Sequence, residues 1–185
     1  MPRALILIDI QQGFDNPVWG ARNNLQAEAN AARLLASWRV NGAPVFHIRH
    51  QSQTPASPLS GQGAEFKPEV APQTGEPVLT KTVNSAFIGT DLEAQLRAAR
   101  IADLVICGLT TPHCVSTTAR MAANLGFSVI LAEDACAAFS ANADMSWRPG
   151  APAPDPQTIH DLAVAHLHGE FVTARQSADI LADGS

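Results

Sequence analysis

The sequence predicts an α/β fold of three layers, α/β/α, with a mostly parallel sheet of about six strands and helices on both faces. Short apolar runs alternate along the chain with helix-like stretches, which is the pattern of a parallel sheet with crossover helices. No internal repeat or domain boundary is visible, and 185 residues are enough for one sizeable core. We therefore expect a single domain over residues 1–185.

Six apolar runs are predicted to form the strands. The run over residues 3–10 is continuously apolar up to Asp9, which is typical of a parallel strand buried on both faces. The other predicted strands cover residues 44–49, 77–80, 102–108, 127–132 and 171–173.

Helices are predicted between most of these strands. Asn23 or Asn24 can cap the first helix, which runs to about Val40 and ends at an Asn-Gly pair, a usual C-terminal signal. The other helices are expected over residues 91–100, 113–125, 157–168 and 177–181. Two stretches rich in Pro and small residues, 51–76 and 140–156, are predicted as long loops, and loops of this length are usually functional or flexible.

The composition argues against two classes of partner. The net charge of −5 leaves no basic footprint for nucleic acid, and no run of eighteen apolar residues could span a membrane. The first apolar run passes into polar residues without a signal-peptide cleavage site, and the three cysteines lack metal-type or redox-type spacing. We expect a cytoplasmic protein with free thiols. Charged residues make up only 16%, a weak indication of an oligomer.

Cys114 is the first candidate for a catalytic group. It lies where the apolar run 102–109 gives way to a helix-like stretch. A helix N-terminus carries unpaired amides and partial positive charge, which would lower the pKa of the thiol and favour the nucleophilic thiolate. The alternative is a small hydrophobic residue buried in a strand–helix corner.

Two further reactive side chains stand at the carboxyl ends of predicted strands. Asp9 closes the first strand and Lys81 follows the third, while Cys114 follows the fourth. Alone, Asp9 could cap a turn and Lys81 could be a solvated surface residue. In open parallel sheets, however, active sites form beyond the carboxyl ends of the strands. Together the three residues would supply an acid–base group, a cation and a soft nucleophile.

The segments around these residues resemble the isochorismatase-like cysteine hydrolases, a family that includes nicotinamidases and carbamoyl-sarcosine amidase. The resemblance covers nearly the whole chain and rests on residues 7–14 (LIDIQQGF), 80–87 (TKTVNSAF) and 108–115 (GLTTPHCV), continuing into 118–120 and 133–135. It implies a catalytic triad of Asp9, Lys81 and Cys114. It also implies a cis peptide bond between Leu109 and Thr110, and an oxyanion hole formed by the amides of Thr110 and Cys114.

The activity that the resemblance implies is hydrolysis of a carbon–nitrogen bond in a small amide, ureide or carbamoyl compound through a thioester. Three alternatives stay open: a non-catalytic interaction or scaffold protein, a vinyl-ether hydrolase and a nucleotide binder. Relatives that cleave a vinyl ether lack the cysteine, so Cys114 disfavours the second. No Gly-x-Gly-x-x-Gly follows the first strand, which disfavours the third.

No metal or other cofactor is expected. Nicotinamidases carry a metal site that begins with Asp-x-His after the second strand, where this chain has His50-Gln-Ser. His47 and His50 are three apart on a strand and should point to opposite faces. The histidines at 160, 166 and 168 include no pair three or four apart. We expect His47 and His166 to be ordinary buried or interface residues, and nicotinamide is a doubtful substrate.

The walls of a substrate pocket are harder to assign. The candidates are side chains from loops near the strand ends, each of which could equally belong to the core or an interface: Phe14, Trp19, Asn84, Phe87, His113 and Trp147. Trp38, Cys107 and Cys136 are expected in the core. The partners expected are a small-molecule substrate and further copies of the chain, since family members commonly form dimers or tetramers.

Overall fold

The computed structural model describes residues 3–184 and shows a six-stranded sheet in which every neighbouring pair of strands is parallel. The strand order is β3-β2-β1-β4-β5-β6. The strands are β1 (Arg3–Ile8), β2 (Val45–His50), β3 (Val78–Lys81), β4 (Asp103–Leu109), β5 (Ser128–Ala137) and β6 (Thr173–Arg175). The predicted α/β class and parallel sheet are confirmed.

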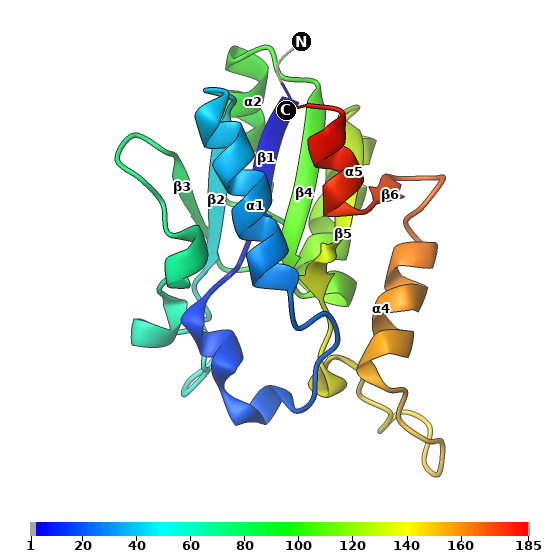
Figure 1. Cartoon of the computed structure of the whole chain (residues 1–185). Coiled ribbons are helices and arrows are strands. Elements are labelled where there is room, and N and C mark those ends of the chain that lie inside the picture. Colours follow the sequence, from blue (N-terminus) through cyan, green and yellow to red (C-terminus); the bar gives the residue numbers. More distant parts are fainter. Residues whose placement is uncertain (1–2, 185) are drawn as a thin grey trace.

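Helices cover both faces of this sheet (Figure 1). They are α1 (Ala27–Val40), α2 (Leu92–Ala98), α3 (Ser116–Asn124), α4 (Pro156–Ala165) and α5 (Ser177–Ala182). Helices α1 and α5 contact each other and lie on one face, while α2 and α3 lie on the other (Figure 1). Within residues 3–184, no helix combines the length and the apolar character that a membrane span requires.

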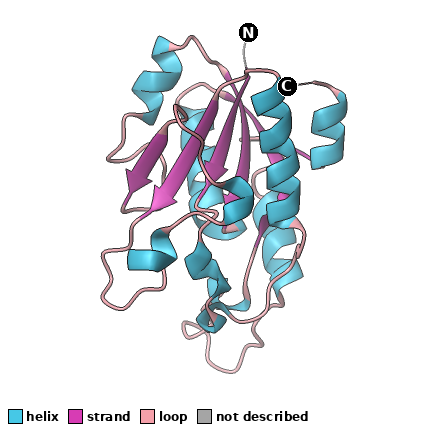
Figure 2. Cartoon of the chain, turned by 60° about the vertical axis from the view of Figure 1, so that its left-hand side comes forward, coloured by secondary structure: helices cyan, strands magenta, loops and turns pink. Residues whose placement is uncertain are grey.

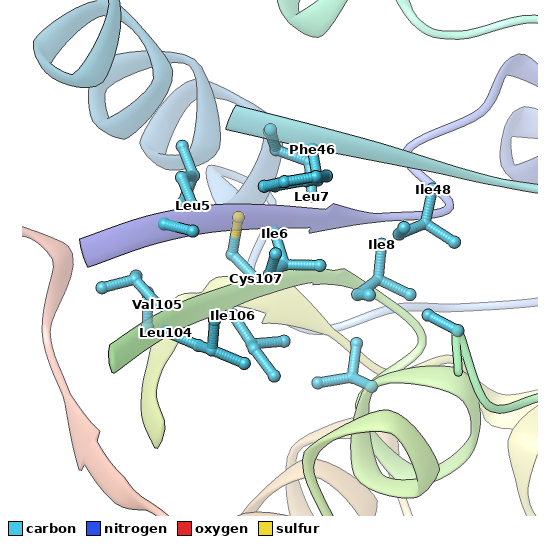
Figure 3. Packing of buried hydrophobic residues seen from close by; sticks show 14 of the residues in the cluster. Leu5, Ile6, Leu7, Ile8, Phe46, Ile48, Leu104, Val105, Ile106 and Cys107 are labelled. Carbon is cyan, nitrogen blue, oxygen red and sulfur yellow. The ribbon is translucent and has the colours of Figure 1, made fainter. Parts of the chain in front are cut away.

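The core lies along the central strands. Leu5, Ile6 and Ile8 of β1 are fully buried, and side chains of β2 and β4 pack beside them (Figure 3). Trp38, Cys107 and Cys136 are also fully buried, as expected. His47 is buried and contacts Glu76 at 2.8 Å, whereas His166 is exposed on this chain.

Several element boundaries differ from the sequence-based prediction. Helix α1 begins at Ala27, because Asn23 and Asn24 bond elsewhere instead of capping it: Asn23 accepts from the Ala138 amide and Asn24 donates to carbonyls at the end of β5. Strand β5 extends to Ala137, past a register shift against β4. The last strand, β6, covers 173–175 instead of 171–173.

The carboxyl ends of the strands all face the same end of the molecule. Figure 2 shows their arrows pointing toward the part of the molecule where the long loops gather. The loop over residues 51–76 contains two short 3₁₀ turns, Gly61–Ala64 and Pro68–Val70, so part of it has regular structure. Any site built on the strand ends therefore lies at the end of the molecule where these loops gather.

Candidate active site

Three strand ends place the predicted triad in one cluster. Asp9 directly follows β1, Lys81 is the last residue of β3, and Cys114 lies in a single π-helical turn, Thr111–Val115, that follows β4. The ends of β1 and β4 approach closely at Gly108, where an added Cβ would lie 2.0 Å from the Ile8 carbonyl oxygen. Only glycine fits there, at a φ of +127°.

The ammonium of Lys81 is the centre of the cluster. Its Nζ lies 2.6 Å from Asp9 Oδ2 and 3.3 Å from Cys114 Sγ. The side chains of Asp9 and Lys81 are completely buried, and Cys114 is partly exposed to the pocket above them. The other carboxylate oxygen, Asp9 Oδ1, is buried and has no hydrogen-bond partner within residues 3–184. A carboxylate oxygen in this position is available to accept a proton.

Burial dominates the protonation of the two acidic groups. It raises the pKa of the Asp9 carboxyl, against the opposing effect of the Lys81 ammonium. It also raises the pKa of the Cys114 thiol to about 12, and the nearby Asp9 charge adds to this rise while Lys81 opposes it. The Cys114 thiol is therefore protonated at rest, and the Lys81 ammonium beside Asp9 favours the ionised form of that carboxyl.

The expectation that a helix N-terminus lowers the pKa of Cys114 is thus wrong. The residue lies inside the π-helical turn, before α3 begins at Ser116, and burial raises the pKa of its thiol. Activation of this thiol requires a base during the reaction, and Asp9 is the adjacent one.

His50 belongs to the cluster, although the sequence analysis did not assign it there. Its Nδ1 lies 3.1 Å from Lys81 Nζ and accepts a hydrogen bond from it. Burial and the Lys81 charge lower the pKa of His50 to about 4, so the ring is neutral at pH 7. His47 faces Glu76 instead, as the alternation of a strand requires. The available signal was the pairing of β2 with β3, which sets His50 opposite Lys81.

A buried glutamine holds the end of β2 in place. Gln11 accepts from the His50 amide at 2.8 Å and donates to the His50 carbonyl at 2.9 Å. It also donates to the Ala64 carbonyl at 2.8 Å, which ties the 51–76 loop to the same point. Gln11 therefore fixes the main chain that carries His50.

Asp9, His50 and Cys114 could be considered as metal ligands, because one donor atom from each lies within 4.8 Å of the others. The Lys81 ammonium, however, already contacts all three of these side chains. A divalent ion among them would be placed beside this positive charge. The three donor atoms therefore surround the Lys81 ammonium, and this arrangement does not fit a divalent metal ion.

A small pocket of about 140 Å³ opens above the cysteine. Of the predicted wall residues, Phe14, Trp19, Asn84 and His113 line it. The full lining is Phe14, Trp19, His50, Leu59, Asn84, Thr110, His113, Cys114 and Asn142. Leu59 and Asn142 were not predicted to line the pocket. They come from the two long loops, and the length of these loops was the only feature of the sequence that indicated a role for them.

Two predicted wall residues lie elsewhere. Phe87 is buried in the core, where its ring stacks on Phe127 with the centroids 5.9 Å apart. Trp147 is 73% exposed at the surface of the 140–156 loop and does not line this pocket. Proximity to a strand end in sequence does not decide the direction of a side chain.

The segment before the cysteine has the predicted backbone. The peptide bond between Leu109 and Thr110 is cis, as expected. Thr110 is buried and lines the pocket together with Cys114, and its carbonyl accepts from the amides of His113 and Val115. The oxyanion hole assigned to the amides of Thr110 and Cys114 stays a prediction.

Comparison with known proteins agrees with this fold. Residues 3–178 match the family model of the isochorismatase domain. YrdC of Bacillus subtilis, an isochorismatase family protein, is 44% identical over 98% of this chain and 95% of its own length. A crystal structure of an isochorismatase-family protein from Chromobacterium violaceum has a TM-score of 0.92 at 46% identity, covering 98% of this chain and 92% of that chain.

The chain therefore belongs to the isochorismatase family of hydrolases. Relatives with a named activity include the maleamate amidohydrolase of Pseudomonas putida, which is 32% identical over 71% of this chain and 70% of that protein. The N-carbamoylsarcosine amidase of Thermoplasma acidophilum has a TM-score of 0.72 at 26% identity, covering 96% of this chain and 97% of that chain.

Proposed function

We propose that this protein is a cysteine-dependent hydrolase that cleaves a carbon–nitrogen bond of a small amide, ureide or carbamoyl compound through a thioester. One observation carries the proposal: the Lys81 ammonium lies 2.6 Å from Asp9 and 3.3 Å from Cys114 beneath a small pocket. A base, a cation and a nucleophile are thus in contact where a substrate carbonyl can enter. Relatives that are named as amidases support the reaction class.

In the first half of the reaction, Asp9 takes the proton of the Cys114 thiol while the sulfur attacks the carbonyl carbon. The proton transfer accompanies the attack, because the thiol is protonated at rest. The amides of Thr110 and Cys114 are assigned to the tetrahedral oxyanion, and donors of this kind contribute about 3–4 kcal/mol each. Asp9 then returns the proton to the leaving nitrogen, and ammonia or an amine departs from the thioester.

In the second half, water enters the position that the leaving group has vacated. Asp9 accepts one proton from this water, and the oxygen attacks the thioester carbonyl. The tetrahedral intermediate collapses to a carboxylic acid (a carbamic acid from a ureide), and the Cys114 sulfur leaves and regains the proton from Asp9. Lys81 stays charged throughout and stabilises whichever of its two partners is negative.

A screen for ammonia release from small amides and ureides tests this proposal. The wild-type protein should turn over at least one class of compound, and Cys114→Ala should lose about 10⁴-fold or more in kcat while staying folded. The matched control is Cys136→Ala, which removes a thiol that is buried outside the pocket and should keep turnover.

The thioester is detected by intact mass after rapid acid quench with a slowly hydrolysed amide. Expected is an acyl adduct on wild type and on Cys136→Ala, and none on Cys114→Ala. Amide hydrolysis retained by Cys114→Ala would refute the cysteine mechanism. An inactive wild type without any adduct would favour the scaffold alternative.

We further propose that the protein acts in the cytoplasm as a dimer or tetramer on a small-molecule substrate. The low content of charged residues and the oligomers common in the family support self-association. Light scattering at micromolar concentration distinguishes this from a monomer of 19.5 kDa.

A further inference from the structure

Among residues 3–184, no side chain that lines the pocket above Cys114 could pair with a negatively charged substrate. Its nine lining residues include neither Lys nor Arg. The two histidines are neutral near pH 7, because burial and Lys81 lower the pKa of His50 to about 4 and partial desolvation lowers that of His113. The polar groups that remain, including the side chains of Asn84 and Asn142, are uncharged.

The one cation beneath the pocket has its donors occupied. A lysine ammonium has three N–H bonds, and Lys81 Nζ has three partners: Asp9 Oδ2 at 2.6 Å, His50 Nδ1 at 3.1 Å and Cys114 Sγ at 3.3 Å. Its positive charge is already balanced by the Asp9 carboxylate. A substrate carboxylate would therefore have to displace a member of the proposed catalytic cluster to reach it.

The neighbouring cations are bound outside the pocket. Arg22 makes a two-bond ion pair with Glu28, at 2.7 and 2.9 Å. Lys67 is held by Asp15 and the same Glu28, at 2.6 and 2.9 Å. Arg49 donates to the hydroxyl of Thr80. These groups stabilise loops and strand ends, and none of them lines the pocket.

One wall of the pocket is aromatic. The rings of Phe14 and Trp19 line it with their centroids 5.1 Å apart, and Phe139, which does not line the pocket, stacks on Phe14 at 5.7 Å. The indole N–H of Trp19 donates to the Gly13 carbonyl at 2.8 Å, so its hydrogen-bonding group is already used. This wall therefore offers apolar contact, and the volume of about 140 Å³ is below that of most ligand sites.

We propose that the site accepts small, uncharged amides with an apolar or planar unsaturated body, and rejects amides that carry a carboxylate. The inference rests on the proposed function and specifies its substrate class. A carboxylate transferred from water into this pocket would lose its hydration without gaining a cationic partner, and such burial is strongly unfavourable. An uncharged amide loses much less.

Two pairs of nearly isosteric compounds test the proposal: maleamide against maleamate, and fumaramide against fumaramate. Members of a pair differ only in whether the second group is an amide or a carboxylate. At pH 7.5 the uncharged compound should have a kcat/KM about tenfold or more above that of its partner, after correction for its two equivalent amides. An equal or larger value for maleamate or fumaramate would overturn the proposal.

A variant that introduces a positive charge at the rim tests the effect of charge separately from that of substrate shape. Asn84 lines the pocket and is exposed, so Asn84→Lys can place an ammonium beside the bound substrate. This variant should improve kcat/KM for the carboxylates relative to the uncharged amides by about tenfold. The matched neutral variant, Asn84→Gln, should change both compounds of a pair by the same factor. An unchanged ratio in Asn84→Lys would refute the charge argument.

Binding to the Cys114→Ala protein separates this inference from the proposed reaction. Calorimetric titration with each pair requires no turnover, and the uncharged compound should bind about tenfold or more tightly. This preference without hydrolysis by wild type would support the ligand class and overturn the reaction. Hydrolysis with a preference for the carboxylate would support the reaction and overturn the ligand class.

Discussion

At the scale of single residues, the site depends on one buried ion pair. Lys81 and Asp9 are both completely buried and 2.6 Å apart, so each makes the burial of the other tolerable. The same pair keeps a negative oxygen next to a thiol. The stability of the fold and the proposed chemistry therefore depend on the same contact. Variants of Asp9 and Lys81 distinguish the two, because unfolding and activity are measured separately.

Removing one partner should destabilise the protein more than removing both. We expect Asp9→Asn and Lys81→Met each to lower the free energy of unfolding by about 3–5 kcal/mol, because each leaves an uncompensated buried charge. The double variant leaves no charge and should be more stable than at least one single variant, while all three lose activity. Urea unfolding followed by circular dichroism measures this cycle. Additive losses would show that the pair is not coupled in the folded state.

The activity should fall as the pH is lowered, and the pH at half-maximal activity should lie above the pKa of an ordinary aspartate carboxyl. Asp9 acts as a base in its ionised form, and its pKa is raised above 3.8 by burial. Activity is therefore present above this raised pKa and lost as the pH falls through it. The measurement is kcat/KM between pH 3.5 and 8 for an amide that does not titrate in this range.

His50 provides the control for this pH profile, because its pKa of about 4 lies in the same region. The acid limb should persist in His50→Gln, which removes the imidazole but leaves Asp9. A limb that disappears in this variant would assign the titration to His50 instead of Asp9.

At the scale of elements, the turn that carries Cys114 is held from below by a buried polar chain. The Thr111 hydroxyl lies 2.9 Å from His160 Nδ1 on α4, and His160 Nε2 lies 3.2 Å from Glu133 Oε2 on β5. The imidazole of His160 therefore links the Thr111 hydroxyl to the Glu133 carboxyl group. Three separate elements thus meet under the nucleophile.

Loss of the Thr111 hydroxyl should loosen this junction. We expect Thr111→Val to lower the free energy of unfolding by about 1–3 kcal/mol, since it leaves the buried Nδ1 of His160 without its hydrogen-bond partner. Thr111→Ser keeps the hydroxyl and should recover most of that loss. The two variants are compared by urea unfolding; equal stability of Val and Ser would show that the bond contributes nothing.

At the scale of the whole molecule, the long loops supply pocket walls that the strand ends do not. Leu59 and Asn142 bring residues from the 51–76 and 140–156 loops to the pocket. The first loop is pressed against the turn after β1: an added Cβ at Gly13 or Gly63 would lie 2.2 or 1.8 Å from the Pro58 carbonyl oxygen. Two glycines therefore permit this close approach.

A side chain at Gly63 should displace the loop and widen the pocket. We expect Gly63→Ala to raise KM for a small amide by roughly an order of magnitude, with a smaller change in kcat, because the clash lies beside Leu59 and away from the triad. The control is Gln62→Ala, an exposed neighbour in the same turn. Steady-state kinetics measures both variants. An unchanged KM in Gly63→Ala would show that the loop does not shape the site.

Much of the fold and of the triad could be predicted from the sequence by itself. Continuous apolar runs such as 3–8 determine buried parallel strands, and the carboxyl ends of such strands meet at one end of the sheet. Asp9, Lys81 and Cys114 were therefore expected together, although they are far apart in the chain. Local pattern was sufficient because strand direction alone decides which ends meet.

Only the tertiary structure decided the properties that depend on what surrounds a side chain. The contact of His50 with Lys81 follows from the β2–β3 register, and the entry of Leu59 and Asn142 follows from the path of the long loops. The raised pKa of the Cys114 thiol follows from desolvation and from the charge of Asp9, a residue distant in sequence. Register, loop path and burial depend on contacts throughout the packed molecule, and no short segment of the sequence determines them.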